Sequence, residues 1–196
     1  QFKKKENRWF EKYVKFKSKK SIFFFDKEVD IKKIEKNINF KISQNQNFIE
    51  FSKGGFDYLK KISRVIKKNT GGLLLIDYGY TDKKMRNTLQ AIRNHKFANI
   101  LNNIGNIDIT HKINFSLFNK FTKQTRGLEN ILTTQRDFLL KIGIKERAEI
   151  ISKNKNFLKK ADMYYRLNRL IDEKQMGNLF KVMLIKNKEN KFKLGF

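Results

Sequence analysis

The residues best suited to chemistry lie at the end of one apolar run, GGLLLIDYGYT at residues 71–81, and in the segments that follow it. Asp77, Tyr78 and Gly79 end the run, and four more candidates follow along the chain: His95, Asp108, Thr110 and Gln135. A histidine in an unpatterned segment can act as a general base or an orienting group near neutral pH. The motif DIT at 108–110 can place a carboxylate and a hydroxyl in a cleft. These residue types predict a polar site.

Each candidate also has a structural interpretation, which the residues alone leave open. Asp77 can cap a turn that Gly79 permits, His95 can make a structural hydrogen bond, and the DIT motif can cap the helix that follows it. Other chemistry is excluded, because a chain without cysteine has no disulfide, no thiol nucleophile and no Cys-based zinc site. Only two histidines occur, and no GxGxxG, P-loop, HExxH or GxSxG motif is present. We therefore expect no metal site.

A strand and a helix must position the first candidates. The continuous apolar run LLLID predicts a strand covered on both faces of a parallel sheet, with Asp77 at its carboxyl end, where ligands bind in open α/β sheets. Before it, apolar residues at helical spacing predict an amphipathic helix over 55–69. We expect Gly71 and Gly72 to end this helix by supplying left-handed backbone geometry.

The remaining elements follow from local patterns. A two-stranded hairpin is predicted from RWFEKYVKF (8–16) and SIFFFD (21–26). We expect a loop with short pieces of structure over 27–47, and a strand at FIEF (48–51). After a long connection at 81–111, helices are expected over 114–123 with Asn114 as N-cap, 133–144, 145–153 and 156–172. The last helix has a predicted apolar stripe made of Leu158, Met163, Tyr164, Leu167 and Leu170. We expect 178–187 and 191–196 to pair as a terminal hairpin.

The charge of the chain is strongly positive. Its 196 residues contain 45 Lys and Arg against 19 Asp and Glu, a net charge of +26, which suggests nucleic acid or an anionic membrane surface as a partner. Lys outnumbers Arg, however, and residues with A/T-only codons are abundant while Pro is absent, so base composition explains much of the charge. The aromatic residues before position 26 can stack on bases or form sheet core. No apolar run reaches the roughly 18 residues of a membrane span.

Several stretches, in order, resemble the MidA family of class I S-adenosylmethionine-dependent methyltransferases. They are GGLLLIDYGY, TLQAIRNHK, GNIDITHKINF, TTQRDFLLKIGIKERAE and MGNLFKVMLI, and RWFEKYV is similar to the segment after the family's fourth strand. The chain departs from the family at Ile104, where a Pro is usual, and at Asn114, which replaces an Asp. The opening QFKKKENRWFEKYV lacks an initiator Met and a signal peptide, so we expect a fragment whose preceding half is absent.

The resemblance implies an α/β fold. The chain would be the C-terminal part of a Rossmann-like class I methyltransferase sheet with a helical acceptor-side insertion. The resemblance predicts a single domain in three parts. Residues 1–80 form a sheet portion with a hairpin, a helix and a buried strand, and residues 81–175 form a mostly helical acceptor-side section. Residues 176–196 form a terminal hairpin of the same sheet. Leu73–Asp77 corresponds to the fifth strand of that sheet.

The resemblance also implies an activity, protein arginine N-methylation linked to respiratory complex I assembly, with S-adenosylmethionine as cofactor. The acceptor is then a protein, possible in the bacterial cytoplasm or the mitochondrial matrix. Asp77 and Asp108 would hold the guanidinium, His95 and Tyr78 would orient it, and the site wall would contain Gly79, Thr110 and Gln135. Most cofactor contacts would lie in the absent half, leaving this fragment inactive by itself. Two alternatives stay open: a nucleic-acid-binding domain, or a non-catalytic assembly or interaction factor.

Overall fold

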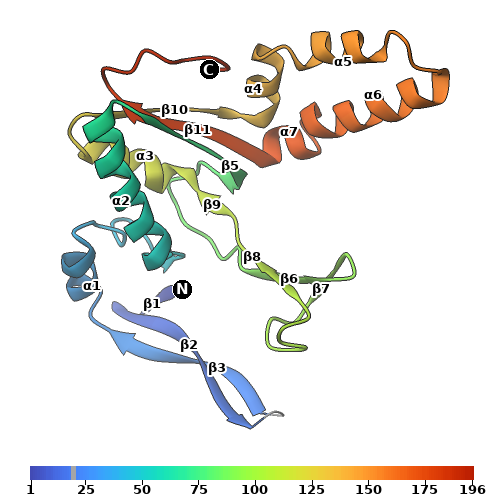
Figure 1. Cartoon of the computed structure of the whole chain (residues 1–196). Helices are drawn as coiled ribbons and strands as arrows, with labels where there is room; N and C mark the ends of the chain where they lie inside the picture. Colours follow the sequence, from blue (N-terminus) through green and yellow to red (C-terminus); the bar gives the residue numbers. More distant parts are fainter. Residues whose placement is uncertain (19–20) are drawn as a thin grey trace. The chain divides into compact units, whose positions relative to one another are not determined.

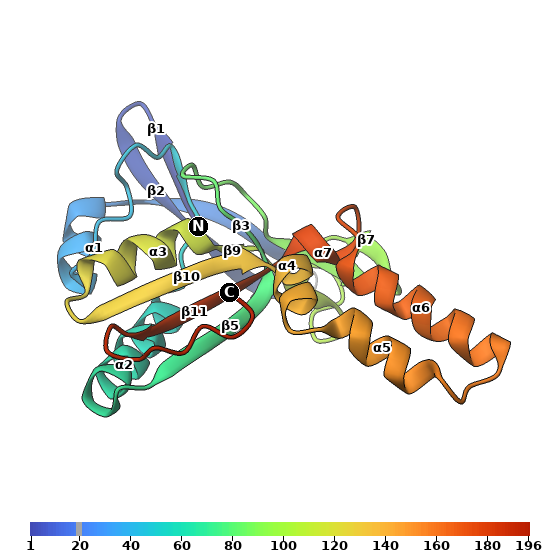
Figure 2. The same cartoon turned by 90° about the horizontal axis from the view of Figure 1, so that it is seen from above.

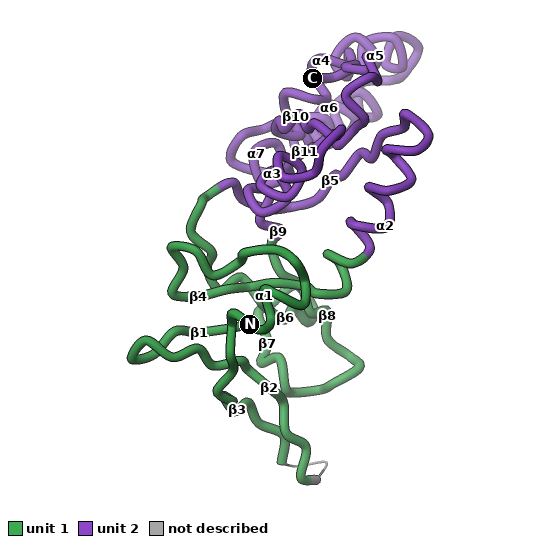
Figure 3. The backbone as a smooth tube through the Cα atoms, turned by 90° about the vertical axis from the view of Figure 1, so that its left-hand side faces the viewer, with its two compact units in different colours: residues 1–57, 82–112 green, residues 58–81, 113–196 purple. Residues whose placement is uncertain are grey.

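The computed structural model describes residues 1–18 and 21–196, which form two compact units (Figure 3). Unit 1 comprises residues 1–57 and 82–112, and unit 2 comprises residues 58–81 and 113–196. The boundary at 57/58 falls within helix α2 (Lys53–Asn69), which the apolar periodicity predicted. These unit boundaries differ from the division at residues 80 and 175 that we expected from the sequence.

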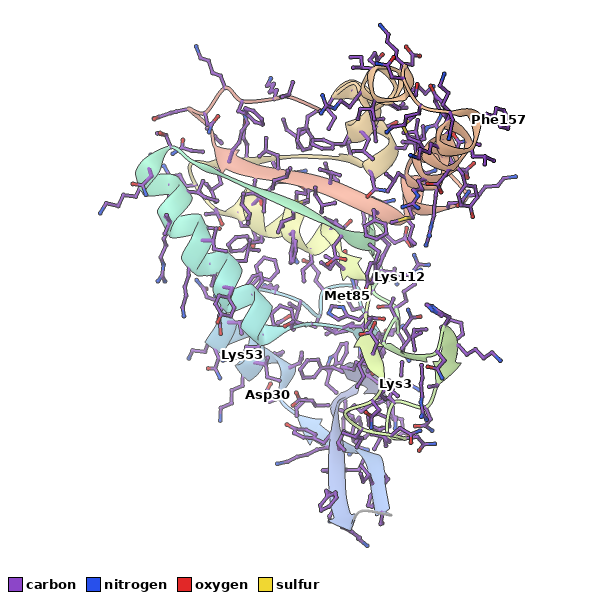
Figure 4. All side chains as sticks on the ribbon, turned by 45° about the vertical axis from the view of Figure 1, so that its right-hand side comes forward. Lys3, Asp30, Lys53, Met85, Lys112 and Phe157 are labelled. Carbon is purple, nitrogen blue, oxygen red and sulfur yellow. The ribbon has the colours of Figure 1, made fainter. Side chains whose placement is uncertain are left out.

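Unit 1 contains an antiparallel sheet with the strand order β3-β2-β1-β4. Its strands are β1 (Phe2–Lys5), β2 (Arg8–Ser18), β3 (Ser21–Val29) and β4 (Phe48–Ile49). The predicted hairpin is confirmed, because Tyr13 lies opposite Phe25 and Val14 opposite Phe24. Helix α1 (Ile31–Ile38) lies in the segment expected to be mostly loop. Its N-cap is Asp30, labelled in Figure 4, which accepts the backbone N–H groups of Lys32 and Lys33.

A second, three-stranded sheet of unit 1 is formed by β6 (Gln90–Arg93), β7 (Lys96–Ala98) and β8 (Asp108–Thr110), in the order β7-β6-β8. This sheet lies in the segment 81–111, which was expected to be a long connection, and the helices of the following segment begin at Phe115, close to the expected position. The apolar side chains buried in unit 1 come mainly from the larger sheet and the helices beside it: Phe2, Trp9, Ile31, Ile38, Phe40, Ile42, Ile49 and Phe56.

Unit 2 is built on a mixed sheet of strand order β10-β11-β5-β9 (Figure 1). Its strands are β5 (Gly72–Tyr80), β9 (Ile113–Asn114), β10 (Leu128–Thr134) and β11 (Phe180–Asn187). β11 is antiparallel to both of its neighbours, and β9 is parallel to β5. The central position of β11 buries its residues 182–185 to 5% exposure or less. Helix α3 (Phe115–Gln124) packs on this sheet, with the predicted N-cap Asn114 accepting the backbone N–H of Leu117.

Strand β5 is confirmed as a strand, but the expectation that both of its faces are buried is wrong. Leu74 and Ile76 are 45% and 50% exposed, whereas Leu73 and Leu75 on the opposite face are half-buried. The reason lies in the neighbours: β9 pairs only with Gly79 and Tyr80, so most of this edge of β5 has no strand beside it in the described residues.

Two further local predictions are corrected. The terminal hairpin does not form, because β10 and β5 already occupy both edges of β11, and residues 191–196 form no strand. Helix α2 ends without left-handed glycine. Thr70 has the positive φ, 49°, and neither Gly71 nor Gly72 does. The N–H of Gly71 bonds to the carbonyl of Ile66 and closes the helix end.

The helices predicted after residue 133 are present as α4 (Gln135–Lys141), α5 (Ile144–Ser152) and α6 (Phe157–Ile171), with a short α7 (Met176–Leu179) after them. Figure 2 shows α5 and α6 side by side. Leu167 of the predicted stripe is buried with Ile171 and Ala148, and Met163 and Leu170 of the stripe pack against this cluster. Leu158 is 76% exposed and does not belong to the stripe, because nine residues place it roughly half a turn around the helix from Leu167. Tyr164 lies at the edge of the stripe and is 38% exposed.

Candidate functional site

The polar end of β5 places its two side chains on opposite faces of the sheet. Asp77 lies opposite Lys181 of β11, and Tyr78 lies opposite Phe180. Successive residues of a strand point to opposite faces, so Asp77 and Tyr78 do not share one wall. The ring of Tyr78 packs edge-on against Phe180, with the ring centroids 5.6 Å apart. Tyr78 is therefore held by an aromatic contact, and Asp77 by a polar environment.

Asp77 belongs to a row that crosses three strands. Lys181 lies opposite Asp77 on one side and opposite Thr134 of β10 on the other. This row lies where β5 and β10 approach their carboxyl ends and where β11 begins. Side chains directly opposite in an antiparallel ladder have Cβ atoms about 4.5–5.5 Å apart, so these three side chains start from neighbouring positions on one face of the sheet. The Thr134 hydroxyl itself accepts the N–H of Asp137 and caps α4. We call Asp77, Lys181 and Thr134 the cross-strand row.

Sequence reasoning missed Lys181 and Thr134. No local signal marks them, because they are far from Asp77 along the chain and only the strand register brings them beside it. The Oδ1 atom of Asp77 accepts the N–H of Tyr78 at 2.7 Å, and its Oδ2 has no hydrogen-bond partner among the described residues. Burial lowers the pKa of Lys181, whose Nζ donates to the carbonyl oxygen of Asn178. Binding of an acceptor group by Asp77 stays a prediction.

Gly79 and Gln135, expected in the site wall, have clear structural partners. A Cβ on Gly79 would come within 2.3 Å of the carbonyl oxygen of Ile113 and 2.7 Å of the Phe115 ring, so close packing requires glycine. Gln135 is buried, and its Nε2 donates to the carbonyl oxygen of Leu170 at 2.9 Å, which links α4 to α6. Contact of either residue with a substrate stays a prediction.

The other three candidates belong to unit 1. His95 is exposed in the turn between β6 and β7, where Asn94 and His95 have φ values of 49° and 60°. Asp108 of β8 lies opposite Ile92 of β6, and the Thr110 hydroxyl accepts a hydrogen bond from the Gln90 side chain at 3.2 Å. The structure thus groups Asp77, Tyr78, Gly79 and Gln135 in unit 2, and the remaining candidates in unit 1.

Unit 1 also contains a polar network that sequence reasoning missed. The carboxylate of Glu50 accepts hydrogen bonds from the side chain of Gln1 at 2.7 Å and from the N–H of Thr88 at 3.2 Å. The Thr88 hydroxyl donates to Glu50 and accepts the N–H of Lys112 at 2.9 Å. The network therefore joins the residue before β6 to the residue after β8, at the two ends of the small sheet. Figure 4 labels Lys112 at the end of this segment.

Two kinds of site are absent from the residues that the structure describes. They contain no group of three or more His, Cys, Asp or Glu side chains that could hold a metal ion. None of their helices is long and apolar enough to cross a membrane.

Sequence comparison relates the chain to methyltransferases. A family model described as "Putative S-adenosyl-L-methionine-dependent methyltransferase" matches residues 1–134. The mitochondrial protein arginine methyltransferase NDUFAF7 of Danio rerio is 27% identical over 130 residues, and that of Xenopus tropicalis is 26% identical over 124. These matches cover 66% and 63% of this chain but only 30% and 28% of the relatives, so the chain spans about a third of their length or less.

Solved structures share the fold. A native crystal structure of a superfamily protein from Burkholderia thailandensis superposes with a TM-score of 0.76 at 21% identity, covering 99% of this chain and 53% of that one. A member of the same superfamily, from the same organism and bound to S-adenosyl-homocysteine, gives 0.72 at 21% identity and covers 51% of that chain. This likeness confirms the predicted α/β methyltransferase fold. Because the family model matches well over half of its residues, the chain belongs to the family of S-adenosyl-L-methionine-dependent methyltransferases.

Proposed function

We propose that the protein containing this chain transfers a methyl group from S-adenosylmethionine to a guanidinium nitrogen of an arginine in a protein substrate. The observation that carries the proposal is the family match over residues 1–134, which includes the carboxyl end of β5. The names of the two curated relatives support arginine as the acceptor residue. By the resemblance described above, the acceptor protein is a subunit of respiratory complex I, and the enzyme contributes to the assembly of that complex.

Asp77 is proposed to bind the acceptor. A guanidinium has a pKa above about 12, so a residue that binds and orients it is of more use than a strong base. A carboxylate matches the planar fork of a guanidinium with charge-assisted hydrogen bonds, and the Oδ2 atom of Asp77 is available for one. The Nζ of Lys181 donates to the carbonyl oxygen of Asn178 and makes no ion pair with Asp77 among the described residues.

The other candidates take supporting roles in the proposal. The roles expected for Asp108 as a second carboxylate, and for His95 and Tyr78 as orienting groups, stay predictions. Tyr78 points to the face of β5 opposite to Asp77, and Asp108 and His95 belong to unit 1. Thr110, Gly79 and Gln135 are proposed to line the wall. Alignment of nucleophile and methyl group is the main requirement of such a transfer, so positioning residues account for most of the expected effect of mutation.

Gly54 and Gly55, at the start of α2 after β4, are candidates for a cofactor cradle among the described residues. S-adenosylmethionine supplies the electrophilic methyl group, and it would need a close backbone cradle. A Cβ on Gly54 would meet no protein atom within 4 Å, so no protein contact requires glycine there. Neither glycine has a positive φ. We therefore assign no cofactor contact to this chain and expect the 196 residues alone to be inactive.

Asp77→Asn in the full-length gene product tests the proposal. The amide keeps the shape of the carboxylate but loses the charge-assisted bond to a guanidinium, worth about 1.5–3 kcal/mol, so turnover should fall roughly 10- to 150-fold. Cofactor affinity should stay unchanged. Radiolabelled methyl transfer to an arginine peptide and the thermal midpoint are measured on the same preparation.

Asp162→Asn is the matched control, because Asp162 is an exposed α6 carboxylate paired with Arg166 at 2.9 Å. It should leave turnover unchanged. An Asp77→Asn variant that is less stable but fully active would assign Asp77 to the scaffold, and Asp108 would become the leading carboxylate. Salt-sensitive RNA binding without methyl transfer would favour the nucleic-acid alternative. The absence of both RNA binding and methyl transfer would favour a non-catalytic assembly factor.

A further inference from the structure

The outer part of the β2–β3 hairpin is both basic and aromatic. Between Lys12 and Phe25 the sequence KYVKFKSKKSIFFF contains no acidic residue. We define the distal ribbon as the described residues 12–17 and 22–25 of this segment. A mixture of lysines with tyrosine and phenylalanine is unusual for an exposed strand, since strands normally alternate apolar and polar positions so that only one face is buried.

The distal ribbon has two open edges. β1 pairs with β2 as far as Glu11, the last hydrogen bond on this side runs from the N–H of Lys12 to the carbonyl of Gln1, and no described strand lies on the other side of β3. Beyond Glu11 the ribbon is therefore two-stranded, as Figure 1 shows for β2 and β3. An isolated two-stranded hairpin is marginally stable in water, so this ribbon gains from a further contact.

Both faces of the distal ribbon are apolar. One face presents Tyr13 with Phe23 and Phe25, and the other presents Val14 and Phe16 with Phe24, because the run Phe23–Phe25 alternates between faces. These side chains are exposed by 37–64%: Tyr13 39%, Val14 53%, Phe16 64%, Phe23 39%, Phe24 37% and Phe25 39%. A partner that covered one face, like an ordinary protein groove, would leave the other face in water.

The lysines lie over the aromatic rings of the ribbon. The Nζ of Lys12 is 5.2 Å from the centroid of Phe24, and the Nζ of Lys17 is 5.9 Å from that of Phe23. Lysine can lay its apolar stem along such rings and keep its ammonium at the polar boundary. In a membrane interface, such rings contact the acyl chains while the ammonium groups stay among the charged headgroups.

We propose that the distal ribbon inserts into the headgroup interface of an anionic membrane. An interface surrounds the ribbon and receives apolar side chains from both faces, while its negative charge attracts the lysines. The open backbone edges keep the insertion shallow, because unpaired N–H and C=O groups are not tolerated in hydrocarbon. Single-stranded nucleic acid explains less: stacking on bases uses the rings but not Val14 and Ile22, and the cations are lysines rather than arginines.

Vesicle co-sedimentation of the 196-residue chain tests the proposal. The chain should pellet with vesicles of phosphatidylcholine and phosphatidylserine, bind phosphatidylcholine alone weakly, and lose binding as salt rises. Replacing Lys12, Lys15 and Lys17 by Gln should weaken partitioning about fivefold per lysine. The double variant Phe16→Ser with Phe24→Ser should weaken it by at least about tenfold.

Matched controls lie on the α5–α6 pair. Phe157→Ser with Leu158→Ser removes two apolar side chains that are 82% and 76% exposed, and Figure 4 labels Phe157 at the start of α6. Replacing Lys153, Lys155 and Lys159 by Gln removes three exposed cations. Both control variants should bind vesicles like the wild type, and far-UV circular dichroism should show that every variant is folded.

Several results would overturn the proposal. Equal binding to neutral and anionic vesicles, or equal losses in the ribbon and control variants, would remove the ribbon from membrane binding. Pelleting without vesicles that the ribbon variants abolish would assign the ribbon to self-association. Tight binding of a fluorescent single-stranded oligonucleotide without vesicle binding would assign it to nucleic acid. The result is independent of methyl transfer, which is measured separately.

Discussion

His95 occupies a turn position that few side chains favour. Asn94 and His95 form the two-residue turn between β6 and β7 with φ values of 49° and 60°, the geometry in which Asn and Gly are preferred. His95→Gly therefore keeps the turn and removes only the imidazole. We expect stability in urea to change by less than about 1 kcal/mol and methyl transfer by the full-length protein to fall at least about tenfold.

Asn94→Gly is the control for the same turn, and it should leave both stability and turnover unchanged. If His95→Gly retains full turnover, the imidazole has no part in the reaction, and the residue is explained by the turn alone.

Lys181 predicts how stability depends on pH. Burial lowers its folded-state pKa below the ordinary value of 10.5, so the charged form costs stability at neutral pH. As the pH rises through the folded pKa toward 10.5, the folded state releases its proton before the unfolded state does, and the cost disappears. Lys181→Met should therefore be more stable than the wild type near neutral pH, with an advantage that shrinks in alkaline buffer.

Urea denaturation across neutral to alkaline pH measures this difference. Lys181→Arg serves as the comparison, because its guanidinium keeps the charge and should retain the cost at alkaline pH. An advantage of Lys181→Met that is constant with pH would show that packing and not ionisation is responsible.

The contact between β5 and β9 depends on one glycine. A Cβ at residue 79 would clash with the carbonyl oxygen of Ile113 and with the Phe115 ring, at 2.3 and 2.7 Å, and neither can move without shifting the start of α3. We expect Gly79→Ala to lower the free energy of unfolding by about 1–3 kcal/mol. Gly54→Ala is the opposite control: its Cβ meets nothing within 4 Å on α2, so it should raise stability by about 0.4–1 kcal/mol.

Urea denaturation followed by circular dichroism gives both values. A neutral Gly79→Ala variant would mean that β9 is free to move away from β5, and the close packing would then not explain the glycine.

The whole chain should not bind S-adenosylmethionine measurably. It spans 53% of the first solved neighbour, and neither Gly54 nor Gly55, which open α2 after β4, has the positive φ of a tight glycine turn. Isothermal titration of the folded 196-residue chain should give a dissociation constant weaker than about 1 mM, or less than about 4 kcal/mol of binding free energy. Saturable binding near micromolar concentration would place a cofactor contact within this chain, and Gly54 would be the first residue to mutate.

The sequence by itself determined the elements whose signals are local. Asn114 caps α3, the aromatic segments at 8–16 and 21–26 pair, and the apolar periodicity locates α2 and α6, because each signal depends on residues only a few positions apart. The ordered family stretches likewise identified a methyltransferase, since they depend on residue identity and not on packing.

Only the tertiary structure decided which strands are neighbours and which side chains they bring together. Lys186 looks like a surface residue in the sequence, yet it is 1% exposed and paired with Glu129 at 3.1 Å, because β11 is the central strand between β10 and β5. The same strand order placed Lys181 beside Asp77 and left Leu74 exposed. Strand register is set by the side chains that the assembled sheet buries, so segments far apart in the chain must meet before it is fixed, and no local pattern encodes it.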